Sequence, residues 1–333
     1  MRILHVGAKN YPPAHGGVEK VVFDLSEGLP RWVHYFFVEW EQSESGLVRV
    51  LRGGFCSQVA GILCLIRRER VSVAHFHKET FIPHALLVSL FFRRTLVTIH
   101  GCAWRIKRWP LAVRIVLYML DLVGCALLPR VVFVSQADHR YFSRLVFWRT
   151  LYYVPNGVQK ARYSASGPRD SFVYLGRLSP EKNILRLIRM FQGRRERLTL
   201  YGPFDQHRSG YREEILQALD EVSGASYGGV VSEADILVTL ARYGGFVSVS
   251  LSEGMPIAVL EAASVGLRLV LSDISQHRDL GFPDVSYVDP LAPSLEGVSG
   301  GYSAENRTHA ETRFSIGATV DMYRSLYEST SEK

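Results

Sequence analysis

Short apolar runs alternate along the first half of the chain with longer segments whose apolar residues recur at helical spacing. In Val18–Leu29 they recur every three or four positions, which predicts a helix. Such short strands alternating with helices predict a parallel sheet covered on both faces. The runs that predict buried strands are Met1–Val6, Val33–Val38, Val71–Phe76, Leu96–Ile99, Val131–Val134 and Tyr152–Val154.

The pattern breaks at Pro155-Asn156-Gly157 and then repeats. A polar stretch to Asp170 indicates a linker between two domains. Strands are expected at Phe172–Leu175, Leu198–Tyr201, Phe246–Ser250, Leu269–Leu271 and Ser286–Val288, and helices at Ile184–Phe191, Tyr211–Val222, Ala234–Arg242, Ile257–Val265 and Phe314–Ser329. The expected fold is α/β, with doubly wound Rossmann-like domains at 1–157 and 158–313, facing a cleft, and a terminal helix at 314–333.

Composition narrows the class of protein. Of the 333 residues, 47% are hydrophobic and 21% charged, which excludes a disordered chain. None of the four cysteines stands in a CxxC pair, which is typical of reduced, intracellular thiols. The start of the chain does not resemble a signal peptide. The apolar stretches Phe81–Phe92 and Pro110–Pro129 are too short or too charged to span a bilayer, so buried or interfacial helices are expected.

The charge lies unevenly along the chain. Residues 1–150 hold 20 Lys and Arg against 10 Asp and Glu, whereas the remainder holds 19 against 22. Three basic groups stand out: Arg67, Arg68 and Arg70; Arg93 and Arg94; and Arg105, Lys107 and Arg108, flanked by Trp104 and Trp109. Arginine interleaved with tryptophan suits an anionic membrane surface or a lipid-linked acceptor. A solvated face without a partner and, less favoured, a nucleic-acid surface are the alternatives.

Two loops of the first half follow predicted strands and carry candidate chemistry. Gly16 and Gly17 open a helix, where the backbone can approach a phosphate and the helix N-terminus favours an anion. Taken alone, such a pair is more often an ordinary tight turn. His100 ends a strand and would place an imidazole at the sheet edge, unless it is a satisfied core histidine.

Two loops of the second half supply charge. Arg177 and Lys182, five residues apart before a helix, form a candidate diphosphate clamp, although a solvated loop is the alternative. Glu253 lies in a loop and Glu261 in the helix after it, so both can address one diol. A helix is expected to begin near Gly254, Met255, Pro256 and Ile257. Its first backbone N–H groups, which Pro256 lacks, could hold phosphate. Together these groups indicate a nucleotide-sugar.

These residues resemble the retaining GT-B glycosyltransferases of family 4, also called group 1. The matching motifs, in order, are Gly16-Gly17-Val18-Glu19, Thr98 to Gly101, Val134-Ser135-Gln136, Pro155-Asn156-Gly157-Val158, Gly176 to Asn183, Glu253 to Glu261 with its Glu-x7-Glu spacing, and Ser272 to Asp279. The chain departs from the family at Leu29-Pro30-Arg31-Trp32, at Val249 to Ser252 and at Asp279, which leaves donor and acceptor open.

The resemblance implies roles by position. Catalytic roles fall to His100, Arg177, Lys182 and Glu253: the two cations neutralise the leaving diphosphate, and His100 lies near the donor sugar. Donor binding falls to Gly16, Gly17, Arg177, Lys182, Glu253, Gly254, Met255, Pro256 and Glu261, with Glu261 on the ribose. The resemblance also implies a terminal helix that crosses back to the first domain, and neither a metal nor an organic cofactor.

The expected function is transfer of a hexose-type sugar, with retained configuration, from a nucleotide-diphosphate sugar to a glycan or lipid-linked acceptor in cell-surface polysaccharide or lipopolysaccharide synthesis. The expected location is the cytoplasmic face of the membrane. A catalytically inactive nucleotide-sugar-binding partner is the main alternative. An epimerase or phosphorylase fits the motif spacing less well, and no nucleic-acid-binding signature is present.

Overall fold

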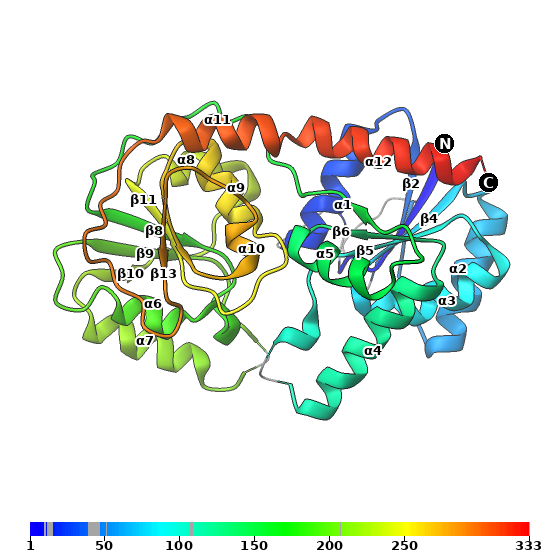
Figure 1. Ribbon diagram of the computed structural model, residues 1–333, viewed down its shortest axis with the longest axis horizontal. Coiled ribbons are helices and arrows are strands. Elements are labelled where there is room, and N and C mark those ends of the chain that lie inside the picture. Colours follow the sequence, from blue (N-terminus) through cyan, green and yellow to red (C-terminus); the bar gives the residue numbers. More distant parts are fainter. Residues whose placement is uncertain are drawn as a thin grey trace. The chain divides into compact units, whose positions relative to one another are not determined.

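The computed structural model describes residues 1–9, 11, 16–38, 47–50, 52–106, 109–206 and 208–332 (Figure 1). The chain divides into two compact units. The first contains residues 1–156 together with 316–333, and the second contains residues 157–315. The last helix, α12 (Ile316–Ser331), therefore belongs to the first unit. It is joined there by hydrogen bonds, including one of 3.1 Å from Thr319 Oγ1 to the Pro155 carbonyl.

The first unit is built on a parallel sheet whose described strands run β3-β2-β1-β4-β5-β6-β7. The strands are β1 (Arg2–Val6), β2 (Val33–Val38), β3 (Val48–Val50), β4 (Val73–His77), β5 (Thr95–Ile99), β6 (Arg130–Phe133) and β7 (Tyr152–Tyr153). The helices are α1 (Gly17–Gly28), α2 (Phe55–Arg68), α3 (Ile82–Phe91), α4 (Leu111–Leu127), α5 (Gln136–Leu145) and α12. The six strands expected from the sequence all form.

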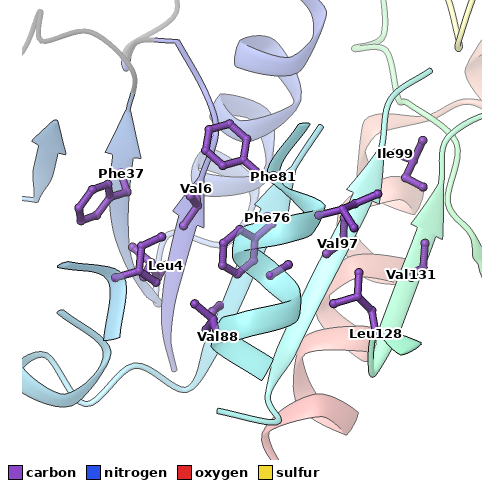
Figure 2. Packing of buried hydrophobic residues seen from close by; sticks show 14 of the residues in the cluster. Leu4, Val6, Phe37, Phe76, Phe81, Val88, Val97, Ile99, Leu128 and Val131 are labelled. Atoms are coloured by element: carbon purple, nitrogen blue, oxygen red, sulfur yellow. The ribbon is translucent and has the colours of Figure 1, made fainter. Parts of the chain in front are cut away.

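One face of this sheet holds an apolar core. Leu4 and Val6 of β1, Phe76 of β4 and Val97 of β5 stand side by side and pack with residues of α3 such as Val88 (Figure 2). These side chains are almost completely removed from water. Because central parallel strands are buried on both faces, their sequences are nearly continuous apolar runs, and this is why periodicity located them.

The second unit repeats the plan with described strands in the order β10-β9-β8-β11-β12-β13, again all parallel. The strands are β8 (Ser171–Leu175), β9 (Arg197–Tyr201), β10 (Ala225–Tyr227), β11 (Gly245–Ser248), β12 (Arg268–Ser272) and β13 (Val285–Val288). The helices are α6 (Ile184–Arg189), α7 (Tyr211–Glu221), α8 (Ile236–Leu240), α9 (Ile257–Ser264), α10 (Ser275–Arg278) and α11 (Ala304–Arg313). Two doubly wound units confirm the expected α/β class.

Several elements were not predicted from periodicity, among them β3, β10, α10 and α11. Both strands have only three residues, too few for an alternating pattern to be recognised. Helix α11 is strongly polar and has little apolar face. The apolar stretch Pro110–Pro129 forms α4, which has 17 residues. No helix in the described ranges combines the length and the apolar character that a membrane span requires.

Candidate active site

The strand order of each sheet reverses at one point. In doubly wound sheets, ligands bind at this point, outside the carboxyl ends of the strands. In the first unit the reversal lies between β1 and β4, and in the second between β8 and β11. Gly16 and Gly17 follow β1. The loop with Arg177 and Lys182 follows β8, and the loop with Glu253 follows β11. Chain topology alone therefore places most of the predicted site residues at these two edges.

In the first unit, Glu19 organises the turn after β1. Its buried carboxylate accepts a hydrogen bond from the Lys9 amide at 3.0 Å and lies 3.8 Å from Lys78 Nζ. Lys78 directly follows β4 and has φ +77°, an uncommon backbone angle for a residue with a side chain. Glu19 belongs to a sequence motif without an assigned role, and Lys78 was not predicted as a site residue, because their contact joins residues 59 positions apart.

Gly16 caps α1 with φ +126°, and a Cβ atom there would lie 2.2 Å from Glu19 Oε2. We expect Gly16→Ala to displace Glu19 and lower the free energy of unfolding by about 1–3 kcal/mol, because both backbone strain and overlap oppose the methyl group. Urea denaturation of this variant beside Gly54→Ala checks the prediction. Gly54 caps α2 and has open space around it, so equal effects of the two changes would contradict it.

In the second unit, hydrogen bonds join the loops after β8 and β11 into one scaffold. Asn183 donates to the carbonyls of Val249 (3.2 Å) and Pro290 (2.7 Å), and the Leu251 amide donates to the Glu181 carbonyl at 2.9 Å. Asn183 has φ +60°, a left-handed conformation that asparagine tolerates. Loop residues distant in sequence are thus held at fixed positions beside the reversal point.

Within this scaffold Lys182 and Glu253 form an ion pair, with Lys182 Nζ 2.5 Å from Glu253 Oε2. The Glu253 side chain is 7% exposed and that of Lys182 is 23% exposed. Burial alone would raise the pKa of Glu253, but the charge of Lys182 and the nearby imidazole of His277 hold this pKa below its usual value. The sequence predicted both residues as site residues but not their contact.

His277 is a further residue of this cluster for which the sequence predicted no role. It is fully buried in α10, and its Nδ1 lies 3.0 Å from the Ser272 carbonyl. A carbonyl only accepts, so Nδ1 carries the proton and Nε2 is an acceptor. Among the described residues Nε2 has no hydrogen-bond partner. Burial lowers the pKa of His277, so the ring is neutral near pH 7.

The remaining donor-site candidates lie around the same two loops. Arg177 is exposed, and within the described part of the chain its guanidinium has no ion-pair partner. Pro256 caps α9, whose first-turn amides lack helical acceptors, and Met255 beside it is buried. Glu261 lies in the second turn of α9 and is 6% exposed. A cation, a helix N-terminus and two carboxylates therefore share one edge of the second sheet.

His100, in the first unit, directly follows β5 and is partly exposed. Its Nε2 lies 3.2 Å from Nδ1 of His77. Burial, and next the charge of Lys78, lower the pKa of His100 to about 3, so its ring is uncharged at physiological pH. The sequence did not predict the partner of this imidazole, although His75 and His77 alternate along β4 and so point to one face.

Three histidines offer the strongest metal-ligand geometry in the described ranges. One ring nitrogen each of His5, His75 and His77 lies within 4.8 Å of the others. All six of their ring nitrogens, however, already lie in hydrogen bonds to His34, His77, Tyr327, Thr98, His5 and His100. This hydrogen bonding accounts for the cluster without an ion.

The basic groups of the first unit have different surroundings. Arg105 pairs with the buried carboxylate of Asp138 at 2.7 Å, so one of its functions is structural. Lys107 and Arg108 lie outside the described residues. Arg67, Arg68, Arg70, Arg93 and Arg94 are exposed.

Known proteins match this chain in sequence and in fold. Residues 169–284 match the family model of group 1 glycosyl transferases. A GDP-mannose:cellobiosyl-diphosphopolyprenol alpha-mannosyltransferase of Xanthomonas oryzae pv. oryzae is 27% identical over 77% of this chain and 70% of its own length. Its counterpart in Xanthomonas campestris is 27% identical over 82% and 79%.

Among solved structures, sucrose-phosphate synthase from Thermosynechococcus elongatus superposes with a TM-score of 0.83 at 16% identity, over 98% of each chain. Anabaena HepE in complex with UDP-glucose gives 0.80 at 15% identity over 100% of each chain. The lipopolysaccharide outer core galactosyltransferase WaaB gives 0.68 at 14% identity over 99% of each. These likenesses establish the fold.

The two doubly wound units, with charged loops at the reversal point of the second sheet, have the GT-B fold of glycosyltransferases. The match over residues 169–284 covers Arg177, Lys182, Glu253 and Glu261. The second unit therefore resembles the group 1 glycosyltransferases over residues 169–284, as the motifs of this part of the chain predicted.

Proposed function

We propose that the protein transfers a hexose-type sugar, with retention of configuration, from a nucleotide-diphosphate sugar to a hydroxyl of a glycan or lipid-linked acceptor. The observation that carries this proposal is the Lys182–Glu253 pair, held 2.5 Å apart within the part of the chain that matches the group 1 family, where Lys182 shares its loop with Arg177. The Xanthomonas relatives act on a diphosphopolyprenol-linked glycan, which supports an acceptor of this kind in surface-polysaccharide synthesis.

In the proposed mechanism, charge that develops on the leaving diphosphate is met by the protein. Lys182 and Arg177 supply positive charge, and the amides at the start of α9 supply hydrogen-bond donors. Glu253 holds Lys182 in place and accepts from a sugar hydroxyl, and Glu261 accepts from the ribose diol. The acceptor hydroxyl attacks from the face that the diphosphate leaves, and its proton passes to a diphosphate oxygen. Because cationic side chains carry the leaving charge, no metal or organic cofactor takes part.

The test is a thermal-shift panel of UDP, GDP, ADP, CMP and dTDP. A ligand at 100 times its Kd should stabilise the fold by about 2.7 kcal/mol. We expect one diphosphate to do so, and Glu261→Ala to abolish the shift. Glu305→Ala, on the exposed start of α11, is the matched control and should keep it. GDP-mannose and UDP-glucose, named with the relative and with HepE, are the first donors to assay for turnover.

Turnover with either donor separates an enzyme from an inactive sugar-binding partner. A nucleotide-dependent shift without transfer to any lipid-linked acceptor would favour the inactive partner. A panel in which no nucleotide stabilises the protein, or in which Glu261→Ala changes nothing, would contradict the proposed donor site.

We further propose that the first unit binds the cytoplasmic face of an anionic membrane through α4. Leu111, Ile115, Met119, Val123 and Leu127 recur every fourth residue, and each is 36–68% exposed. We call these five residues the α4 stripe. The neighbouring helix α5 adds the exposed Arg144. An apolar stripe beside basic side chains is typical of a helix lying in the headgroup region.

Replacing Ile115 and Met119 with serine should reduce binding to vesicles of phosphatidylglycerol and phosphatidylethanolamine by about tenfold or more, because apolar area drives such binding. Co-sedimentation measures it. The control replaces Val230 and Leu291, two exposed apolar residues of the second unit, with serine. Vesicle binding that is unchanged in the α4 variant, or lost equally in the control, would refute the membrane role. Replacing Arg105 is a poor test, since it would leave buried Asp138 without its cation.

A further inference from the structure

Four histidines of the first unit form one continuous hydrogen-bonded row across its sheet. His34 of β2, His5 of β1 and His77 of β4 stand on adjacent strands, and His100 follows β5. The ring nitrogens are 3.0 Å apart between His34 Nδ1 and His5 Nε2, 3.1 Å between His5 Nδ1 and His77 Nε2, and 3.2 Å between His77 Nδ1 and His100 Nε2. Every link joins an Nδ1 to an Nε2.

The hydrogen bond of His34 at the far end of the row fixes which nitrogen of each ring donates. His34 Nε2 lies 3.2 Å from the backbone carbonyl of Leu29, which can only accept a hydrogen bond. His34 must therefore carry its proton on Nε2. A neutral imidazole has one N–H, so His34 Nδ1 accepts, His5 Nε2 donates and His5 Nδ1 accepts in turn. The same reasoning carried through His77 places the proton of His100 on Nε2.

The surroundings keep the row uncharged. His5, His34 and His77 are 0–6% exposed. Burial lowers the pKa of each of the three, and their neighbouring imidazoles lower the pKa of His5 and His77 further. An added proton would place a charge inside the sheet. With one proton per ring and one carbonyl at the end, only one arrangement of protons satisfies all four hydrogen bonds.

We infer that His34, His5 and His77 are positioning residues that hold His100 as the Nε2–H tautomer and present its Nδ1 as a fixed hydrogen-bond acceptor. Among the described residues none is recorded as a partner of that Nδ1. A neutral acceptor suits a ligand hydroxyl, which can donate, and disfavours a carboxylate or phosphate oxygen, which cannot. The row therefore prepares the site for a neutral sugar hydroxyl; this last step rests on the proposed function.

Nuclear magnetic resonance of protein labelled with ¹⁵N-histidine tests the inference directly, without any ligand. Protonated and unprotonated ring nitrogens resonate far apart, so each ring reports its tautomer. At pH 7 we expect His34, His5, His77 and His100 all to carry the proton on Nε2 alone. Because no donor is needed, this result is independent of whether the proposed function is correct. A His100 ring protonated on Nδ1, or exchanging between tautomers, would overturn the inference.

Variants at the far end of the row separate positioning from packing. His34→Phe removes the anchor, and the tautomer of His100 should become mixed. His34→Gln keeps an amide N–H for Leu29 and an oxygen for His5, so it should restore the wild-type spectrum. His139→Phe is the matched control: His139 also bonds a backbone carbonyl, that of Leu151 at 3.1 Å, but lies outside the row. It should leave His100 unchanged.

The rate of sugar transfer should change in the same variants that change the tautomer of His100. With a donor that the wild type uses, we expect kcat/KM to fall about fivefold in His34→Phe and to stay near wild type in His34→Gln and His139→Phe. If His34→Phe does not fold, the wild-type spectrum and His34→Gln still decide the question. An unchanged His100 spectrum in a folded His34→Phe protein would overturn the inference. So would a shift of His5, His75 and His77 on addition of one equivalent of Zn²⁺, which would show a metal site instead.

Discussion

Replacing Lys182 with alanine is expected to lower kcat for sugar transfer by about 10²–10³-fold, the loss seen when one preorganised group that stabilises transition-state charge is removed. The effect on acceptor KM should be small, because Lys182 lies in the second unit, with most of the donor-site candidates. Steady-state kinetics with the donor identified by the thermal-shift panel measures both quantities. Wild-type turnover in Lys182→Ala would contradict the phosphate role.

This substitution also leaves the buried Glu253 without its cation, which destabilises the fold. The double variant Lys182→Met/Glu253→Gln separates the two effects, because it removes both charges and should recover much of the lost stability without recovering turnover. Lys160→Ala is the matched control, since Lys160 pairs with Glu311 at 3.5 Å but is 78% exposed. It should change neither stability nor kcat appreciably.

Replacing Asp121 with asparagine is expected to stabilise the protein at pH 8 by a few kcal/mol. Asp121 is fully buried in α4, and burial, followed by the nearby carboxylates of Glu79 and Asp138, raises its pKa to about 8. The unfolded chain loses this proton near pH 4, whereas the folded protein retains it. Between these values the folded state binds more protons, so stability falls as pH rises from about 4 to 8.

Urea denaturation from pH 5 to pH 8 measures this effect. The free energy of unfolding of the wild type should decline across this pH range. Asp121→Asn should remove the part of the decline that Asp121 causes. Asp220→Asn, at an exposed position in α7, provides the control for loss of a carboxylate and should leave the profile unchanged. Parallel profiles for wild type and Asp121→Asn would show that Asp121 is ionised in the folded protein near neutral pH.

The sequence predicted the parts of the fold that rest on local pattern. Central strands such as β1 and β5 are buried on both faces, so their apolar runs are unmistakable. The site residues could be predicted because glycine turns and the loops between strands and helices are recognisable from a few adjacent residues. Their contacts could not, since Lys182 and Glu253 are 71 residues apart and meet only through sheet topology. The histidine row needed the strand order, which brings His34 beside His5 and His5 beside His77.

The return of α12 to the first unit has a consequence for biosynthesis. Residues 157–315 form a continuous segment and can fold as soon as they leave the ribosome. The first unit waits longer, because the hydrogen bonds of His75 to Tyr327 (2.6 Å) and of Thr98 to Tyr323 (3.1 Å) join its sheet to residues made more than 220 positions later. The half of the protein that is synthesised first is therefore the last to be completed, and its sheet face stays uncovered during the interval.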